Sequence, residues 1–87
     1  MRRAAKIDTT ARALVATARQ LGAQVLVLNS TVDALLCFRG MVYVVDWKTP
    51  KHGQPTTAQA RLIEDGWPLH FVSTVEELTD LLLRRTP

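Results

Sequence analysis

Three ionisable residues, Asp33, Asp46 and Lys48, stand at one end of an otherwise apolar stretch that reads as a β-hairpin. A two-residue turn at positions 39–40 would place Asp33 directly opposite Asp46. Side chains alternate along a strand, so Asp46 and Lys48 project from one face, and Asp33 joins them as the cross-strand neighbour of Asp46. The turn decides this, because a one-residue bulge would send the two carboxylates to opposite faces.

Two opposed carboxylates need a neutralising partner. At a separation of about 5 Å and an effective dielectric constant near 20, their repulsion is on the order of 3 kcal/mol. Lys48 can offset part of this charge, and a divalent cation held by the hard carboxylate oxygens can offset the rest. The pattern therefore predicts a divalent-cation site beside a lysine.

The elements that must position these residues follow from periodicity and from helix and strand boundary signals. The pattern predicts the order helix, three strands, helix, strand, helix. The first expected element is a helix of about 13 residues that is capped by Asp8 and ends at Gly22, followed by a strand at 24–28 and the two hairpin strands. A second helix is expected from Thr56 or Thr57 to about Asp65, and a fourth strand at 69–72. A capping box at 74–77 begins the last helix, whose apolar stripe consists of Leu78, Leu81 and Leu82.

Short connections predict an antiparallel meander for the first three strands, and the helix before the fourth predicts a parallel crossover. The fold class is therefore α/β (α+β), a four-stranded mixed sheet. Both faces of the hairpin are apolar, so we expect helices on both sides, with Cys37 as a small buried residue. Trp67 is expected in the core beneath the second helix, and Trp47 and Tyr43 on the sheet face away from the carboxylates.

Composition limits the function classes. The 87 residues predict a single domain over 1–87, small enough for self-association to be plausible. A net charge of +3 favours an anionic partner, and the one cysteine excludes a disulfide framework and a thiolate metal site. Residues 1–7 form a basic arm with no signal-peptide run after it, and no stretch is long enough to cross a bilayer. We expect no membrane contact and a cytoplasmic (intracellular) protein.

The chain resembles the P-D-(D/E)-x-K nuclease superfamily, nearest to its small Holliday-junction-resolvase-like and VRR-NUC-like members, which are often found in phages. The residues that carry the resemblance are Val32-Asp33 for the first acid, Asp46-Trp47-Lys48 for the second acid and the lysine, and Thr57-Ala58-Gln59 in the next helix. The order of elements also matches the αβββαβ, restriction-endonuclease-like core of that superfamily, with a C-terminal helix added.

The resemblance implies that Asp33 and Asp46 bind Mg²⁺ or Mn²⁺ and that the backbone carbonyl of Trp47 completes the site. Lys48 would orient or activate the attacking water, and Gln59 would approach the metal or the scissile phosphate. Val32 replaces the usual proline and Asp46 the more usual glutamate. The first helix lacks the glutamate of many resolvases, which leaves open whether one or two metals act.

Gln59 has an alternative role, because with Thr56 it completes a T-x-x-Q capping box at the start of the second helix. Lys51, in the loop after Lys48, is the first candidate for a phosphate contact. The basic arm, with Arg2, Arg3 and Lys6, is the second candidate. His52 is expected to be a solvated loop residue.

The expected function is hydrolysis of DNA phosphodiester bonds by a metal-dependent endonuclease, with a branched or four-way junction as the favoured substrate. A homodimer would place two sites on one substrate, and the leucines of the fourth strand and last helix are candidates for its interface. One alternative is a non-catalytic DNA-binding or assembly module on the same fold. A weaker one is a purely structural dimerisation module.

Overall fold

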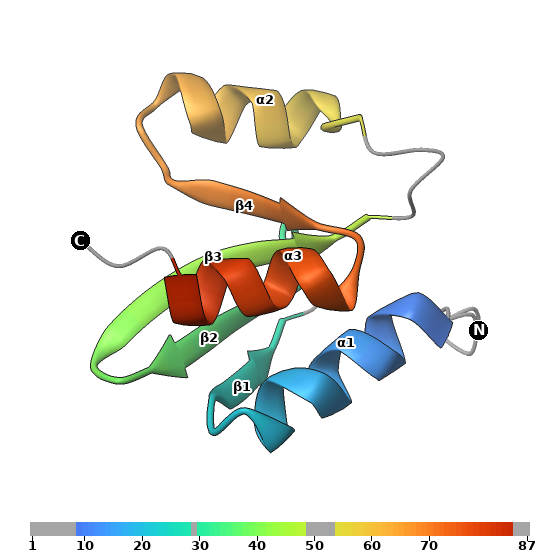
Figure 1. The fold of residues 1–87 in the computed structure, drawn as a ribbon. Helices are drawn as coiled ribbons and strands as arrows, with labels where there is room; N and C mark the ends of the chain where they lie inside the picture. Colours follow the sequence, from blue (N-terminus) through green and yellow to red (C-terminus); the bar gives the residue numbers. More distant parts are fainter. Residues whose placement is uncertain (1–8, 29, 49–53, 85–87) are drawn as a thin grey trace.

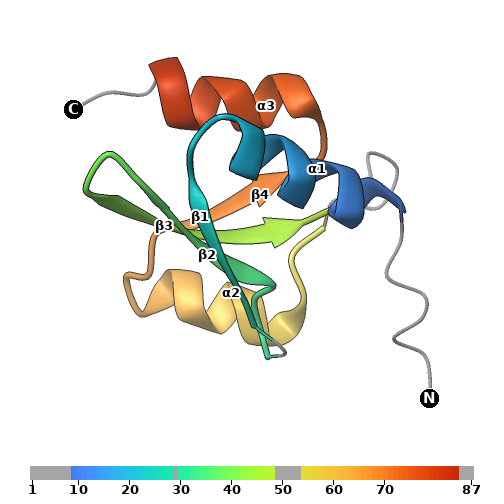
Figure 2. The ribbon, with the colours of Figure 1, turned by 90° about the horizontal axis from the view of Figure 1, so that it is seen from below.

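The computed structural model describes residues 9–28, 30–48 and 54–84. A four-stranded mixed sheet lies between two helical layers, with α1 and α3 on one face and α2 on the other (Figures 1 and 2). The α/β (α+β) fold class and the predicted order of elements are therefore confirmed. The elements are α1 (Thr9–Gln20), β1 (Gln24–Val27), β2 (Ala34–Phe38), β3 (Met41–Trp47), α2 (Thr57–Glu64), β4 (Leu69–Val72) and α3 (Val75–Thr79), which continues as a π-helical segment over Asp80–Arg84.

The strand order is β1-β2-β3-β4, antiparallel through β3 and parallel between β3 and β4, as predicted. The hairpin register pairs Phe38 with Met41 and Ala34 with Val45, which is the register of a two-residue turn. Arg39 and Gly40 both have positive φ, 52° and 82°. This pattern is typical of a type I′ turn, whose twist matches that of the flanking strands. The pairing runs without a bulge from Phe38–Met41 to Ala34–Val45, which brings the strand ends next to Asp33 and Asp46 together.

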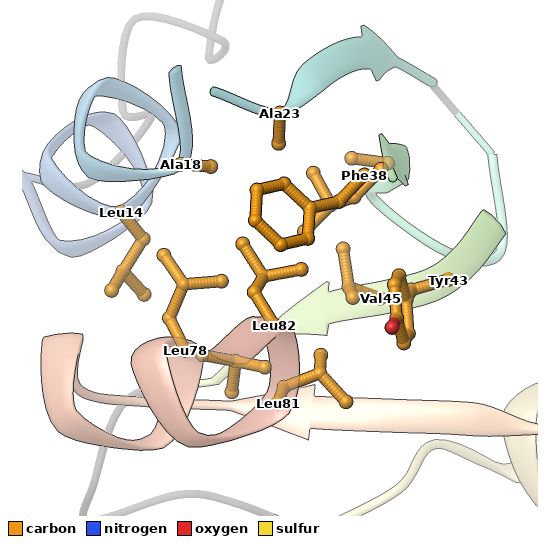
Figure 3. Packing of buried hydrophobic residues seen from close by; sticks show 12 residues of the cluster. Leu14, Ala18, Ala23, Phe38, Tyr43, Val45, Leu78, Leu81 and Leu82 are labelled. Atoms are coloured by element: carbon orange, nitrogen blue, oxygen red, sulfur yellow. The ribbon is translucent and has the colours of Figure 1, made fainter. Parts of the chain in front are cut away.

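The hydrophobic core lies between the sheet and the layer formed by α1 and α3 (Figure 3). Leu14 and Ala18 contribute the buried stripe of α1, and Gly22 ends that region with a φ of 105° that other residues rarely adopt. The predicted cap residue Asp8 lies outside the described residues. The buried cluster consists of Leu14, Ala18, Ala23, Ala34, Leu36, Phe38, Tyr43, Val45, Val72, Leu78, Leu81 and Leu82.

The last helix begins as predicted at Thr74, whose Oγ1 accepts a hydrogen bond from the Glu77 amide at 3.0 Å. The Glu77 carboxylate reaches one residue further back than a capping box requires and accepts from the Ser73 amide at 2.6 Å. The three leucines of the apolar stripe, Leu78, Leu81 and Leu82, are all buried in the core. These three leucines are therefore not available for the dimer interface that the sequence suggested, whereas Leu83 of the same helix is 36% exposed.

The second helical layer covers its face of the sheet only in part, which contradicts two predictions. Cys37, expected to be buried, is exposed on β2, and Trp67, expected in the core, is 55% exposed. Cys37 stays exposed because α2 is short, with eight residues and a length of about 12 Å. Gln59 is its only buried residue. Trp47 and Tyr43 do pack against or within the core, as predicted.

Within the described parts of the chain, none of the helices has the combination of length and hydropathy that crossing a bilayer requires.

Candidate functional site

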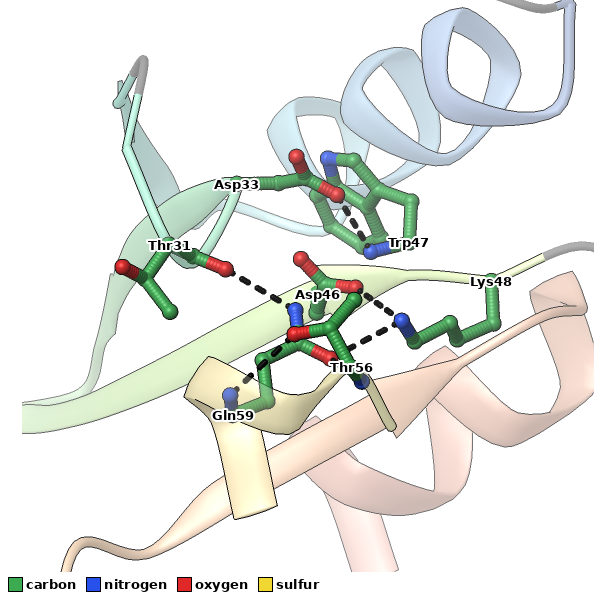
Figure 4. A network of polar contacts seen from close by, with 7 residues as sticks. All are labelled: Thr31, Asp33, Asp46, Trp47, Lys48, Thr56 and Gln59. Atoms are coloured by element: carbon green, nitrogen blue, oxygen red, sulfur yellow. Dashed lines mark hydrogen bonds and ion pairs between the residues drawn. The ribbon is translucent and has the colours of Figure 1, made fainter. Parts of the chain in front are cut away.

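Asp33 and Asp46 come together at the end of the β2–β3 hairpin (Figure 4). The Asp33 amide donates to the Val45 carbonyl at 3.2 Å, one residue away from the Asp46 that the β2–β3 register would place opposite it, so the regular ladder ends at Ala34. One carboxylate oxygen of Asp33, Oδ2, accepts from the Trp47 amide at 2.8 Å. These two contacts fix the backbone and the side chain of Asp33 against β3, beside Asp46. The predicted meeting of the two carboxylates is therefore present.

The environment of Asp33 favours its protonated form. Its pKa is raised from 3.8 to about 6, first because burial removes the carboxylate from water and then because Asp46 adds a like charge and a side-chain hydrogen bond. The Trp47 amide and the Lys48 charge act in the opposite direction without cancelling these effects. The pair is thus deficient in positive charge even with the lysine in place.

Lys48 is held beside the carboxylates in a nearly closed environment. Its Nζ lies 2.9 Å from Asp46 Oδ2 and donates to Gln59 Oε1 at 2.9 Å. The side chains of Lys48 and Asp46 are only 11% and 8% exposed. The ammonium also lies 5.2 Å from the centre of the Phe71 ring, a distance at which cation–π attraction operates. The lysine is therefore fixed from three directions.

Gln59 connects the site to two further parts of the backbone. Its side-chain Oε1 accepts from both Lys48 Nζ and the Thr56 backbone amide, the latter at 3.0 Å. The backbone amide of Gln59 donates to Thr56 Oγ1 at 3.1 Å. Its Nε2 donates to the Thr31 carbonyl at 2.8 Å. The helix-cap role is present in the geometry and the side chain also contacts Lys48, whereas the predicted approach of Gln59 to a metal or a phosphate stays a prediction. Gln59 ties the start of α2, the lysine and the segment before Asp33 together.

The sequence did not identify two residues of the candidate site, Thr31 and Phe71. Phe71 pairs with Asp46 in the parallel β3–β4 register, so its side chain lies on the same sheet face as the carboxylate. The fourth strand was predicted with its correct bounds, but its offset against β3 was not, and only the offset identifies the residue beside the lysine. Thr31 acts through its main-chain carbonyl, for which residue type gives no signal.

The oxygen donors at the site suit a small divalent cation. In the described part of the chain, no three His, Cys, Asp or Glu side chains converge, so two carboxylates are the acidic donors here. The Trp47 amide faces Asp33, and in an extended strand the carbonyl of a residue points to the same side as its amide, so this carbonyl is a third candidate donor. Mg²⁺ typically keeps several waters and binds few carboxylates. Asp33, Asp46 and the Trp47 carbonyl therefore fit its chemistry.

The other candidates from the sequence, Lys51, His52, Arg2, Arg3 and Lys6, lie outside the described residues, so their placement relative to the site stays a prediction. No protein-family model matches the chain, and neither the curated proteins nor the solved structures contain a match to it. The geometry of the site is therefore the basis on which a function is proposed for this chain.

Proposed function

We propose that the chain is a Mg²⁺- or Mn²⁺-dependent endonuclease that hydrolyses DNA phosphodiester bonds. The observation that carries the proposal is the arrangement of two adjacent carboxylates, Asp33 and Asp46, with the Lys48 ammonium 2.9 Å from Asp46 Oδ2. Acids of this kind bind the hard cations that assist phosphoryl transfer, and a fixed lysine beside them suits an anionic transition state.

The residues have distinct roles in this proposal. A bound cation would supply Lewis acidity toward the phosphate and lower the pKa of a bound water. Asp33, Asp46 and the Trp47 carbonyl would hold it. An ammonium has three donors, and two of those on Lys48 are used by Asp46 and Gln59, which leaves one for a water or a phosphate oxygen. Gln59, fixed by Thr31 and Thr56, would keep that donor in place.

The substrate class follows from charge and size. A net charge of +3 and a pI near 9.6 favour a polyanion such as DNA. An 87-residue chain has little surface for reading bases, so a structure-specific substrate such as a branched or four-way junction is preferred to a specific sequence. Lys51, Arg2, Arg3 and Lys6 are the proposed phosphate contacts, and a homodimer acting in the cytoplasm would present two sites to one substrate.

One observation favours a second candidate, a non-catalytic DNA-binding or assembly module. Lys48 already pairs with the Asp46 oxygen that a cation would use, and Gln59 and Phe71 enclose the same ammonium. A site closed in this way can serve stability alone. Under this alternative, DNA binding survives Asp46→Asn and needs no divalent cation.

The two candidates are separated by a cleavage assay. Labelled four-way junction, flap, linear duplex and single-stranded DNA are incubated with the protein and Mg²⁺ or Mn²⁺. The Asp46→Asn and Lys48→Ala variants are compared with Asp65→Asn, a matched change at an exposed aspartate at the end of α2. Both site variants are expected to lose cleavage by about 100-fold or more, and the control to retain it. Binding without cleavage under either metal would support the module, and absence of both would reject both candidates.

A further inference from the structure

The sheet face that carries the carboxylates continues into an uncovered apolar surface toward the hairpin turn. The register aligns Leu26, Leu35 and Val44 in one row across β1, β2 and β3, and Gln24, Cys37 and Val42 in the next. Because side chains alternate, both rows lie on the same face as Asp46. We define the open face by these six residues. It begins one row, about 7 Å, from the candidate site.

This face is exposed to solvent although its residues are apolar. Leu26 is 59% and Val42 62% exposed, Cys37 and Gln24 are exposed, and Leu35 and Val44 are half-buried. Antiparallel sheets with one wet face normally carry polar residues there. α2, the one described helix on this side, is anchored at the opposite end of the face through Gln59 (Figures 1 and 2). The face thus has the composition of a buried surface, and the described residues, 9–28, 30–48 and 54–84, do not cover it completely.

Charge and area indicate what covers it. The open face carries no charged side chain, whereas binding a polyanion such as DNA requires cations. Each chain carries a net charge of +3, but the open face itself is uncharged. Two copies can therefore pack through this face without bringing like charges together. Three strands about 4.8 Å apart and two rows about 6.8 Å apart give a footprint of roughly 200 Å². This is about a quarter of the roughly 800 Å² per partner that a standard interface buries, which indicates a transient association.

We propose that the open face is a self-association surface, on which two copies of the chain pack sheet against sheet around a two-fold axis. This interface does not depend on the proposed activity. It is also distinct from an edge-to-edge pairing of β1, which would use both faces of that strand equally.

The chain offers a matched pair of residues for the test. Val42 and Val27 are both strand valines with nearly equal exposure, 62% and 64%, but Val27 aligns with the buried Ala34 and Val45 and so belongs to the opposite face. Val42→Glu would introduce two charges into a two-fold interface, because each change appears twice. Val27→Glu has a similar intrinsic cost to the strand without touching the open face.

The experiment measures molar mass by light scattering from about 10 µM to about 500 µM, a range suited to a transient dimer. The wild-type mass is expected to rise from 9.7 kDa toward twice that value. Val42→Glu should remain monomeric and Val27→Glu should follow the wild type, with circular dichroism confirming that both variants fold. Cys37, the one cysteine of the chain, provides a second readout: its labelling by a thiol reagent should slow about fivefold or more in the dimer and recover in Val42→Glu.

The proposal is overturned if the wild type stays monomeric over this range, or if a dimer survives Val42→Glu with Cys37 still reactive. Loss of the dimer in both variants would equally overturn it, because Val27 lies on the opposite face, and loss in Val27→Glu alone would overturn it in favour of edge pairing through β1. None of these results bears on cleavage, so failure of the self-association surface is distinguishable from failure of the proposed activity.

Discussion

The protonation state of Asp33 should control the stability of the metal-free protein between about pH 4 and pH 6. The pKa of Asp33 is raised from 3.8 to about 6, mainly by burial and then by Asp46. The folded state therefore holds this proton more tightly than the unfolded chain does. Its contribution to stability is complete below pH 3.8 and is lost as the pH rises toward 6.

The size of the effect follows from the shift. A rise of about 2 pKa units, at about 1.4 kcal/mol each, sets an upper limit of about 3 kcal/mol. Asp33 is only partly buried, so solvent screening reduces the expected loss to about 1–2 kcal/mol. Asp33→Asn removes the titration while keeping an oxygen that accepts from the Trp47 amide, which makes it the matched control.

The assay is urea unfolding of both proteins at half-unit steps from pH 4 to pH 7 without divalent cations. Subtracting the two stability curves isolates Asp33 from the other titrating groups. The wild type should lose about 1–2 kcal/mol more than Asp33→Asn over this interval. The carboxyl carbon of Asp33 should titrate by NMR with a midpoint near 6. A midpoint near 4, or parallel curves for the two proteins, would refute the description of a buried, charge-deficient pair.

Other perturbations test separate parts of the structure. Mg²⁺ at ten times its dissociation constant should stabilise the wild type by about 1.4 kcal/mol and Asp33→Asn by much less, measured by urea unfolding at pH 7; equal effects would contradict a site at Asp33. Gln59→Ala should lower the unfolding free energy by about 2 kcal/mol because it removes one of the two oxygen partners of the Lys48 ammonium and the donor to the Thr31 carbonyl, and Gln59→Glu should lower it less because it keeps the acceptor oxygen. Gly40→Ala should lower the unfolding free energy by about 1 kcal/mol through backbone strain alone, since φ is 82° and no atom lies within 4 Å of an added Cβ. Trp67→Ala should change stability by less than about 0.5 kcal/mol, because the ring is exposed; a larger loss would show that it packs after all.

The hairpin was predictable because its determinants are local. A glycine at the second turn position permits a two-residue turn, and that turn fixes the pairing from Phe38–Met41 to Ala34–Val45, next to Asp33 and Asp46. The sequence did not reveal that Arg39 also adopts a positive φ, of 52°. That conformation costs a residue other than glycine some free energy, and the arginine recovers part of it by lying 4.8 Å from the Phe38 ring.

The extent to which helix α2 covers its sheet face was not predictable, because it depends on the length and position of the helix and not on the hydrophobic periodicity of the sequence. The hairpin is apolar on both faces, which correctly predicted helices on both sides of the sheet (Figures 1 and 2). Periodicity cannot show how far a short helix reaches once its position is fixed. Gln59 holds α2 over the site, so Cys37, near the other end of the face, stays exposed. The limited extent of α2 therefore accounts for the error at Cys37.

Gln59 caps α2 and contacts Lys48 at the same time, so these two roles do not exclude each other. The T-x-x-Q pattern predicted a capping box, and the resemblance to nucleases predicted a site residue. One oxygen, Oε1, accepts from both the Thr56 amide and Lys48 Nζ. The cap fixes where that oxygen lies before any ligand is present, and the oxygen in turn fixes the ammonium beside Asp46. Formation of the first turn of α2 and positioning of Lys48 are therefore one event, and a variant that weakens the cap should also loosen the lysine.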